Sequence, residues 1–267
     1  LPTTLKVLVL NKSYPWECNT YYAQGGVTTA YDNEDIPLHV KDTLEAGAGM
    51  CDEAAVVKMS QDSQAAIRRL IERGFSFDKD DDGQLLYTKE AAHSRNRILH
   101  AGGDATGRHL HFFLLQNNPH PMLGDATVID LLIHNNRCYG VEILSEGKQH
   151  HIYANHVIIA SGGIGSLYEF HTNASTVCGE LQGICVEKNI PLEAMEMTQF
   201  HPTVFVANNW ARKLLLTEAL RGEGAHVVDE NGYRFLFEYD PRGELASRDI
   251  VSRAIFDYKR KTKKNVY

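Results

Sequence analysis

The sequence has no long apolar run and no paired cysteines. Nowhere in its 267 residues is there a stretch near the ~20 apolar residues of a membrane-spanning helix, and no basic-then-apolar leader opens it. The five cysteines are widely spread without a Cys-x-x-Cys pair, which indicates neither a disulfide framework nor a zinc site. We therefore predict a soluble, cytoplasmic protein with reduced thiols and no membrane partner.

The chain also lacks an excess of positive charge. Its formal net charge is -7, so no basic face large enough to neutralise nucleic-acid phosphates is expected. The basic run 259–264 has the composition of a solvated helix end. The 13 histidines include the pairs His109 with His111 and His150 with His151, but neither pair has further residues at ligand spacing. We predict no nucleic-acid partner and no metal.

The apolar run Leu5–Leu10 has the pattern of a buried parallel strand and is followed by a polar loop and Gly25-Gly26. A second apolar run, Val157–Ala160, ends the strand expected over 150–160 and is followed by the glycine loop 161–165. A glycine loop after a strand lies at the sheet edge where α/β proteins bind ligands. No Gly-x-Gly-x-x-Gly turn stands upstream, and the chain starts immediately before what would be a second strand.

The other elements follow from periodicity and turn residues. A helix is expected over 53–73, ending at Gly74, and another over 109–117. Strands are expected over 126–134 and 139–144, joined by a turn at Asn135-Asn136, and over 150–160. Further helices should follow Gly179 and begin at Ser247 or Arg248.

The segment 197–249 is the richest in chemistry. It combines arginines, a histidine, carboxylates and hydroxyls with interleaved glycines. Arginine presents a rigid, permanently charged fork that matches a carboxylate, and glycine lets the backbone approach closely. The pattern predicts a site for a small polyanion.

Several strings in the sequence together resemble one flavoprotein family. They are 19–26 (NTYYAQGG), 88–100 (TKEAAHSRNRILH), 199–203 (QFHPT), 216–224 (LTEALRGEG) and 242–249 (RGELASRD). The family contains L-aspartate oxidase and the catalytic subunits of succinate dehydrogenase and fumarate reductase. The resemblance implies an α/β fold with an α+β second domain, namely a Rossmann-like FAD-binding domain (1–203) and the start of an inserted capping domain of the fumarate reductase type (204–267).

The resemblance implies FAD as cofactor and names its contacts. They are Lys12, Asn19, Thr20, Tyr21, Tyr22, Ala23, Gln24, Gly25, Gly26, Gly162, Gly163 and Glu180. Relatives that attach flavin covalently carry a histidine at the position of Asn19. Asparagine cannot form that bond, so non-covalent FAD is expected.

Glu90 is the expected contact for a substrate ammonium group. A carboxylate in a site otherwise built for anions needs a cation, because an unpaired buried carboxylate is unfavourable. The family's aspartate oxidases have a glutamate here, followed by glycines where this sequence has Ala91-Ala92. The alternative is a surface ion pair of Glu90 with Arg95 or Arg97.

The resemblance also implies the remaining site residues. Gln199, His201, Thr217 and Glu218 are expected to bind the substrate, with a protonated His201 adding positive charge. Arg248 is the expected proton-transfer residue, held by Glu218, Glu244 or Asp249. Because the free pKa of arginine suits neither an acid nor a base, such a role needs tight restraint.

Glu90 and Asn19 favour the L-aspartate oxidase group of this family. The implied activity is FAD-dependent oxidation of L-aspartate to iminoaspartate with oxygen or fumarate as acceptor, in NAD biosynthesis through quinolinate, with quinolinate synthase as a candidate partner. One alternative is a soluble fumarate reductase or succinate dehydrogenase-like flavoprotein. The other is a truncated, inactive module, since the family's first strand and C-terminal region have no counterpart in this sequence.

Overall fold

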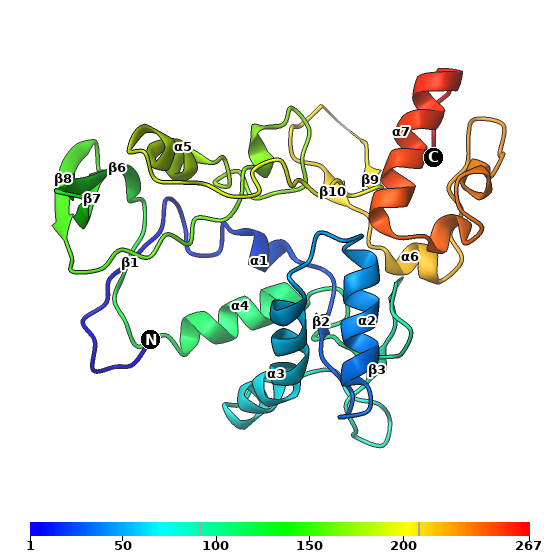
Figure 1. Ribbon diagram of the computed structural model, residues 1–267, viewed down its shortest axis with the longest axis horizontal. Helices are drawn as coiled ribbons and strands as arrows, with labels where there is room; N and C mark the ends of the chain where they lie inside the picture. Colours follow the sequence, from blue (N-terminus) through cyan, green and yellow to red (C-terminus); the bar gives the residue numbers. More distant parts are fainter. Residues whose placement is uncertain (91, 208) are drawn as a thin grey trace. The chain divides into compact units, whose positions relative to one another are not determined.

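The structure, a computed structural model, describes residues 1–90, 92–207 and 209–267 (Figure 1). Contacts between Cα atoms group the chain into two units that alternate along the sequence. The first unit comprises Leu1–Tyr22, His111–Thr198 and Val206–Leu214, and the second comprises Ala23–Leu110, Gln199–Phe205 and Leu215–Tyr267. The expected domain boundary after Thr203 stays a prediction.

The first unit contains an antiparallel three-stranded sheet. Its strands are β6 (Thr127–His134), β7 (Arg137–Ser145) and β8 (Lys148–Tyr153), in the order β6-β7-β8. Asn135 and Asn136 adopt φ values of 47° and 58°, the left-handed conformation that a tight hairpin turn requires. This confirms the turn expected from the sequence. The sheet buries Leu131, Val141 and Ile143 against Cys185 of α5 (Glu180–Glu187).

Two expected strands are shorter than the sequence indicated. Only Val9–Leu10 of the first apolar run is a strand, β1, which pairs in parallel with β5 (Met122–Leu123). The segment 157–160 is not a strand, so that prediction is wrong. No described strand pairs with it and Ile158 is 71% exposed, whereas a buried strand needs ladder partners and cover on its faces.

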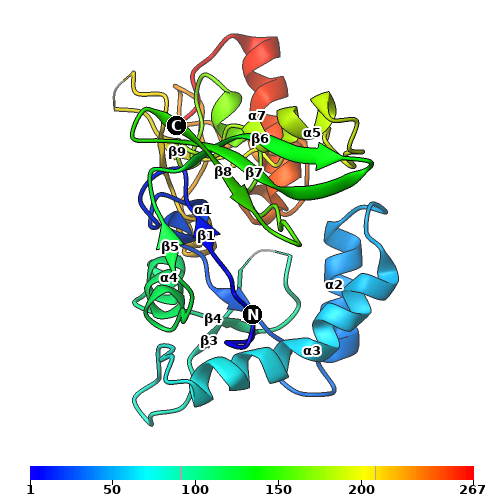
Figure 2. The ribbon, with the colours of Figure 1, turned by 90° about the vertical axis from the view of Figure 1, so that its left-hand side faces the viewer.

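The second unit contains a pair of helices, α2 (Ile36–Ala46) and α3 (Glu53–Glu72), which pack against each other (Figure 2). The Asp52 carboxylate accepts the Ala55 N–H at 3.0 Å and caps the start of α3. Gly74, with φ of 96°, follows its end, so the expected helix is confirmed within a residue. Of the apolar side chains on α3, Val56 is buried but Met59 is 50% exposed.

Short elements complete the chain. In the second unit, β2 (Val27–Thr28) and β3 (Tyr87–Thr88) flank β4 (Ile98–Leu99) in an antiparallel sheet. The others are α1 (Asn19–Tyr22), α4 (Thr106–Gln116), β9 (Val204–Phe205), β10 (Leu214–Leu215), α6 (Ala219–Gly222), and the 3-10 turns η1 (Gly165–Leu167), η2 (Phe235–Glu238) and η3 (Gly243–Leu245). None of the helices in the described ranges is long and apolar enough to cross a bilayer.

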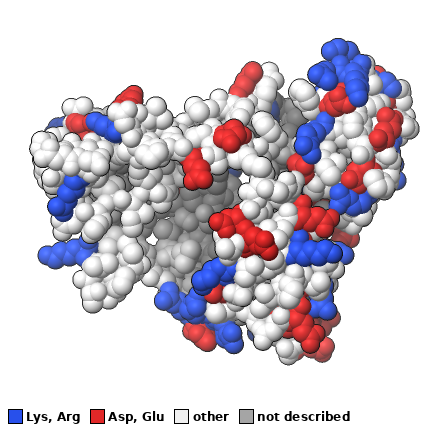
Figure 3. Space-filling view, viewed as in Figure 1, with Lys and Arg blue, Asp and Glu red and all other residues white. Residues whose placement is uncertain are grey.

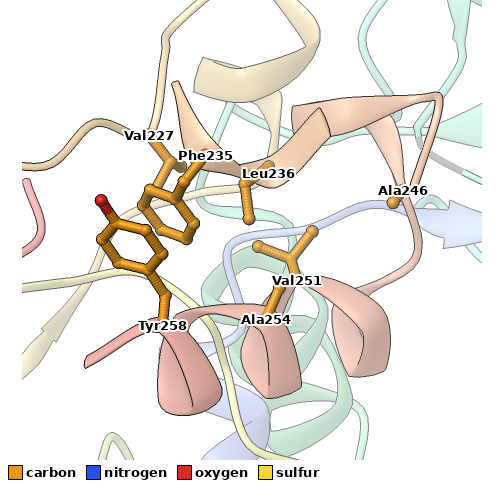
Figure 4. Close-up of a cluster of buried hydrophobic side chains, with 7 residues drawn as sticks. All are labelled: Val227, Phe235, Leu236, Ala246, Val251, Ala254 and Tyr258. Atoms are coloured by element: carbon orange, nitrogen blue, oxygen red, sulfur yellow. The ribbon is translucent and has the colours of Figure 1, made fainter. Parts of the chain in front are cut away.

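A compact apolar cluster anchors α7 (Arg248–Thr262). It consists of Val227, Phe235, Leu236, Ala246, Val251, Ala254 and Tyr258 (Figure 4). The rings of Phe235 and Tyr258 stack with centroids 4.0 Å apart. The C-terminal end of α7 carries exposed basic residues (Figure 3). Their positive charge is favourable beside the negative end of the helix dipole. The cluster therefore fixes the helix that begins at Arg248.

Replacing Phe235 should test this anchor. Phe235 has no exposed surface, so Phe235→Ala is expected to lower the free energy of unfolding by about 3–5 kcal/mol. The control is Phe256→Ala on α7, whose side chain is 70% exposed and whose loss should change stability by less than about 0.5 kcal/mol. Urea unfolding measures both, and equal effects would contradict the assignment of the core.

Candidate functional site

Glu218 is a buried carboxylate held between two guanidinium groups. Its Oε1 lies 3.2 Å from Nη2 of Arg221, and its Oε2 accepts a 2.5 Å hydrogen bond from Nε of Arg248. Glu218 and Arg221 are 8% and 4% exposed, so their charges interact in a medium of low dielectric constant. Two cations against one anion leave this cluster with residual positive charge.

Backbone and side-chain contacts bring the Gln199–Thr203 motif to α7. Nη1 of Arg248 donates a hydrogen bond to Oε1 of Gln199 at 3.3 Å. One turn later on α7, Oγ of Ser252 donates to the carbonyl oxygen of Phe200 at 2.8 Å. These two contacts hold Gln199 beside Arg248.

Of the three carboxylates expected to restrain Arg248, Glu218 is the one that contacts it. Glu244 instead accepts two hydrogen bonds from Arg234, at 3.0 and 2.7 Å, and its backbone carbonyl accepts one from Arg221 at 2.6 Å. Asp249 pairs with Arg253 at 2.6 Å. Glu244 therefore supports the cluster through Arg221.

His201 presents a buried nitrogen to this cluster. Its Nδ1 lies 2.9 Å from the carbonyl oxygen and 3.3 Å from the amide nitrogen of Thr203, while its Nε2 is buried without a partner among the described residues. Burial lowers the pKa of His201, and the cations Arg248 and Arg221 lower it further. The hydrogen bond that the ring donates to the Thr203 carbonyl oxygen and the charge of Glu218 oppose this shift. A neutral imidazole is therefore favoured at pH 7, in contrast to the protonated one expected from the sequence.

Glu90 is a half-buried carboxylate within electrostatic range of the same cluster. Burial raises its pKa and the negative charge of Glu218 raises it further, while Arg248, His100 and a hydrogen bond from the Gly26 N–H act in the opposite direction. Its alternative partners are engaged elsewhere: Arg97 binds Asp35 and Asp42, and Arg95 lies 3.9 Å from Asp32. The surface ion pair considered for Glu90 is therefore wrong.

The backbone beside Glu90 is strained. Ala92 has φ of 66°, a conformation that glycine adopts freely and alanine rarely. The resemblance implies glycine at this position, and Ala92 adopts the left-handed conformation. Ala91 lies outside the described residues.

The structure thus brings together Glu90, Gln199, His201, Glu218 and Arg248, with Thr217 directly preceding Glu218 in the chain. All of them belong to the second unit. The cluster combines guanidinium groups, an imidazole and an amide with one carboxylate of raised pKa. Such a donor set can bind a dianion that also carries one positive charge.

The expected cofactor residues of the first unit are already paired with protein groups. Oδ1 of Asn19 accepts the Ala174 N–H at 2.8 Å, and its Nδ2 donates to Oδ1 of Asn173 at 2.7 Å. Both carboxylate oxygens of Glu180 lie 2.6 Å from Nζ of Lys12. A cofactor contact from these residues would use the backbone or exchange a partner.

Beyond Asn19, α1 continues through Thr20 and Tyr21 to Tyr22. The hydroxyl of Tyr22 donates to Glu17 at 2.6 Å, and the guanidinium of Arg212 lies 3.4 Å from the centre of its ring. The ring of Tyr21 contacts that of Phe112 edge-on, with centroids 5.7 Å apart. The aromatic pair is therefore packed into the first unit.

The glycines expected at the cofactor differ in their surroundings. A Cβ on Gly26 would lie 2.6 Å from the carbonyl oxygen of Leu99, so Gly26 is needed for close packing against β4. A Cβ on Gly25 would lie 3.5 Å from Oε1 of Glu90. A Cβ on Gly163 would have no described atom within 4 Å, and the neighbouring Gly162 has φ of 79°.

The loop Ala23–Gly26 fits a flavin in one respect. The Oε1 of Gln24 is buried and has no hydrogen-bond donor among the described residues. A buried acceptor without a partner is unfavourable, and the flavin ring system offers an N–H that could satisfy it. The open surroundings of Gly163 also leave room for a ligand at that glycine.

Sequence reasoning missed the residues that hold these groups in place. Ser252 supports Phe200, Asn173 supports Asn19, and Asp42 binds Ser94 four residues beyond Glu90. Their partners are 52, 154 and 52 residues away in sequence. No local pattern signals such contacts.

Neutralising Glu90 should stabilise the ligand-free protein at neutral pH. Because its folded pKa is raised above the unfolded value, the folded state binds more protons between these two values, and stability is lost as pH rises through the folded pKa. Glu90→Gln should therefore gain stability over the parent as pH rises from 4 to 8. Urea unfolding across this range measures the gain, and a difference that shrinks with pH would contradict the burial of Glu90.

Alanine substitutions should separate the two kinds of glycine. Gly26→Ala is expected to lower the free energy of unfolding by about 1–3 kcal/mol, because the new methyl group meets backbone. The matched control Gly163→Ala meets open space and should change stability by less than about 0.5 kcal/mol. Thermal and urea unfolding report both values, and a larger loss for Gly163→Ala would reverse the assignment.

Comparison with known proteins agrees with these features. A model for the family described as FAD binding domain matches residues 3–267. The L-aspartate oxidase of Bacillus subtilis is 43% identical over 96% of this chain and 49% of its own length. That of Nostoc sp. is 39% identical over 98% of this chain and 46% of its own length. The chain therefore spans about half the length of these relatives.

Solved structures give the same fold. A mutant of E. coli quinol fumarate reductase superposes with a TM-score of 0.88 at 29% identity, covering 98% of this chain and 48% of that one. Mycobacterium smegmatis Sdh1 superposes with a TM-score of 0.76 at 25% identity, covering 96% and 46%. The expected fold, a FAD-binding domain of the fumarate reductase flavoprotein type, is confirmed. This chain belongs to the FAD binding domain family and is a homologue of the L-aspartate oxidases.

Proposed function

We propose that this chain is the cofactor- and substrate-binding part of an L-aspartate oxidase. The observation that carries the proposal is Glu90, a half-buried carboxylate whose pKa is raised by burial and by the negative charge of Glu218, with Arg248 also in electrostatic range. A dicarboxylate alone would leave Glu90 uncompensated. An α-ammonium group on the same dicarboxylate would compensate it, which selects aspartate over succinate.

In the proposed complex the two substrate carboxylates lie against the cationic side of the cluster. Arg248 remains accessible, with 35% of its side chain exposed, and Gln199 lies beside it. Nδ1 of His201 lies closest to the carbonyl oxygen of Thr203, so in the neutral ring Nδ1 carries the proton and Nε2 is a buried acceptor. A nearby dianion raises the pKa of an imidazole, so substrate binding favours the protonated ring, whose Nε2–H donates to a carboxylate.

Arg248 is the proposed proton-transfer residue. Glu218 grips its Nε at 2.5 Å and Gln199 binds its Nη1, so the guanidinium is restrained in one orientation. Restraint of this kind is a prerequisite for proton transfer by a group whose free pKa is so high. Bound FAD supplies the acceptor for the hydride that leaves the α-carbon of the substrate.

The proposed FAD contacts are those expected from the sequence, namely Lys12, residues 19–26, Gly162, Gly163 and Glu180. Gln24 supports the proposal with its unpartnered acceptor, and Asn19 makes the attachment non-covalent. The proposed product is iminoaspartate, with oxygen or fumarate reoxidising the cofactor. Its proposed use is in NAD biosynthesis through quinolinate, with quinolinate synthase as candidate partner.

The runner-up function is a fumarate reductase or succinate dehydrogenase-like activity, which the solved structures at 25–29% identity favour. An anaerobic titration of the flavin-loaded protein distinguishes the two. L-aspartate is expected to bleach the flavin absorbance, with an apparent rate constant at least about tenfold above that for equimolar succinate. Bleaching by succinate alone would establish the runner-up, and bleaching by neither would overturn both.

A further inference from the structure

The loop that carries Glu90 is fixed at both of its ends by the β3–β4 sheet. Thr88 of β3 pairs with Ile98 of β4, and Arg97 N–H donates to the carbonyl oxygen of Thr88 at 3.0 Å. Nε2 of His100 also lies 2.8 Å from Oγ1 of Thr88. The sheet therefore sets where the loop begins and ends, but leaves its outer part unspecified.

Asp42 of α2 holds the outer part of the loop through Ser94. Its Oδ2 accepts hydrogen bonds from both the N–H and the Oγ of Ser94, at 2.8 and 2.7 Å. The turn between Ser94 and Glu90 is closed by His93 N–H, which donates to the carbonyl oxygen of Glu90 at 3.3 Å. Asp42 is therefore linked to Glu90 through two sets of hydrogen bonds, from Ser94 to Asp42 and from the His93 N–H to the Glu90 carbonyl oxygen.

Asp42 is itself fixed by a buried ion pair. Arg97 is fully buried, donates to Asp42, and grips both oxygens of Asp35 at 3.0 and 2.6 Å. Burial alone would raise the pKa of Asp42, but the hydrogen bonds from Arg97 and Ser94 outweigh it and hold that pKa below its ordinary value. The anchor is therefore charged and rigid at neutral pH.

We propose that Ser94 is a positioning residue that sets the selectivity of the site for α-ammonium dicarboxylates by tying the Glu90 loop to Asp42 on α2. This inference rests on the proposed function. A charge-assisted hydrogen bond has a donor–acceptor distance of about 2.7–2.9 Å, so a displacement of the Glu90 carboxylate by about 1 Å would break its contact with the ammonium group. A dicarboxylate without an ammonium group makes no contact with Glu90. Its Kd is therefore not expected to depend on the hydrogen bonds between Ser94 and Asp42.

Equilibrium binding of two non-oxidisable ligands tests the proposal on the flavin-loaded protein. They are 2-methylaspartate and 2,2-dimethylsuccinate, which differ by an ammonium in place of a methyl group and have no hydrogen on that carbon. The parent should bind the ammonium ligand about tenfold more tightly or better. Ser94→Ala removes one of the two bonds to Asp42, and is expected to reduce this ratio about tenfold without changing the Kd for 2,2-dimethylsuccinate.

Three variants complete the experiment. Ser94→Thr keeps the hydroxyl and should restore the ratio, Glu90→Gln should abolish it, and Arg95→Ala in the same loop should leave it unchanged, since Arg95 lies 3.9 Å from Asp32. If Ser94→Ala keeps the parental ratio while L-aspartate still reduces the flavin, the positioning role is overturned and the proposed function stands. If the parent itself shows no preference and L-aspartate leaves the flavin oxidised, both are overturned.

Discussion

A buried carboxylate between two guanidinium groups constrains the C-terminal part of the second unit, 215–267. Removing charges from water is unfavourable unless each is paired, so Glu218 requires both Arg221 and Arg248 within hydrogen-bonding range. Arg221 in turn needs the carbonyl group of Glu244, and Glu244 needs Arg234. The apolar cluster packs against α7 and holds this helix, which begins at Arg248.

The two carboxylates of the site, Glu218 and Glu90, differ in whether a guanidinium group pairs with them. Glu218 pairs with guanidinium groups in the ligand-free protein, whereas Glu90 is half-buried with a raised pKa and accepts a hydrogen bond from the Gly26 N–H. Functional sites often retain such local instability, because a ligand can supply the opposite charge. His201, whose pKa is lowered, and Gln24, whose Oε1 has no hydrogen-bond donor among the described residues, are further groups that a ligand could complete.

The polar residues of the site could be predicted from the sequence better than the strands and long-range contacts that surround them. Glu90, His201, Glu218 and Arg248 occur in dense local strings, and the structure brings these strings together. The helix at 53–72 and the Asn135-Asn136 turn have local causes as well. The strand expected at 157–160 failed because a strand depends on neighbours, which an apolar run cannot supply. The Asp42–Ser94 contact was missed because only folding joins residues 52 apart.

Ala92 reveals a property of the Glu90 loop that contacts alone do not. An L-residue with φ of 66° is about 1–2 kcal/mol less stable than in its ordinary conformations, so the surroundings must impose this shape. Alanine also has a much narrower left-handed basin than glycine. A glycine here would allow several backbone conformations. The methyl group of Ala92 restricts the backbone and so fixes the position of the Glu90 carboxylate, but it lowers the free energy of unfolding.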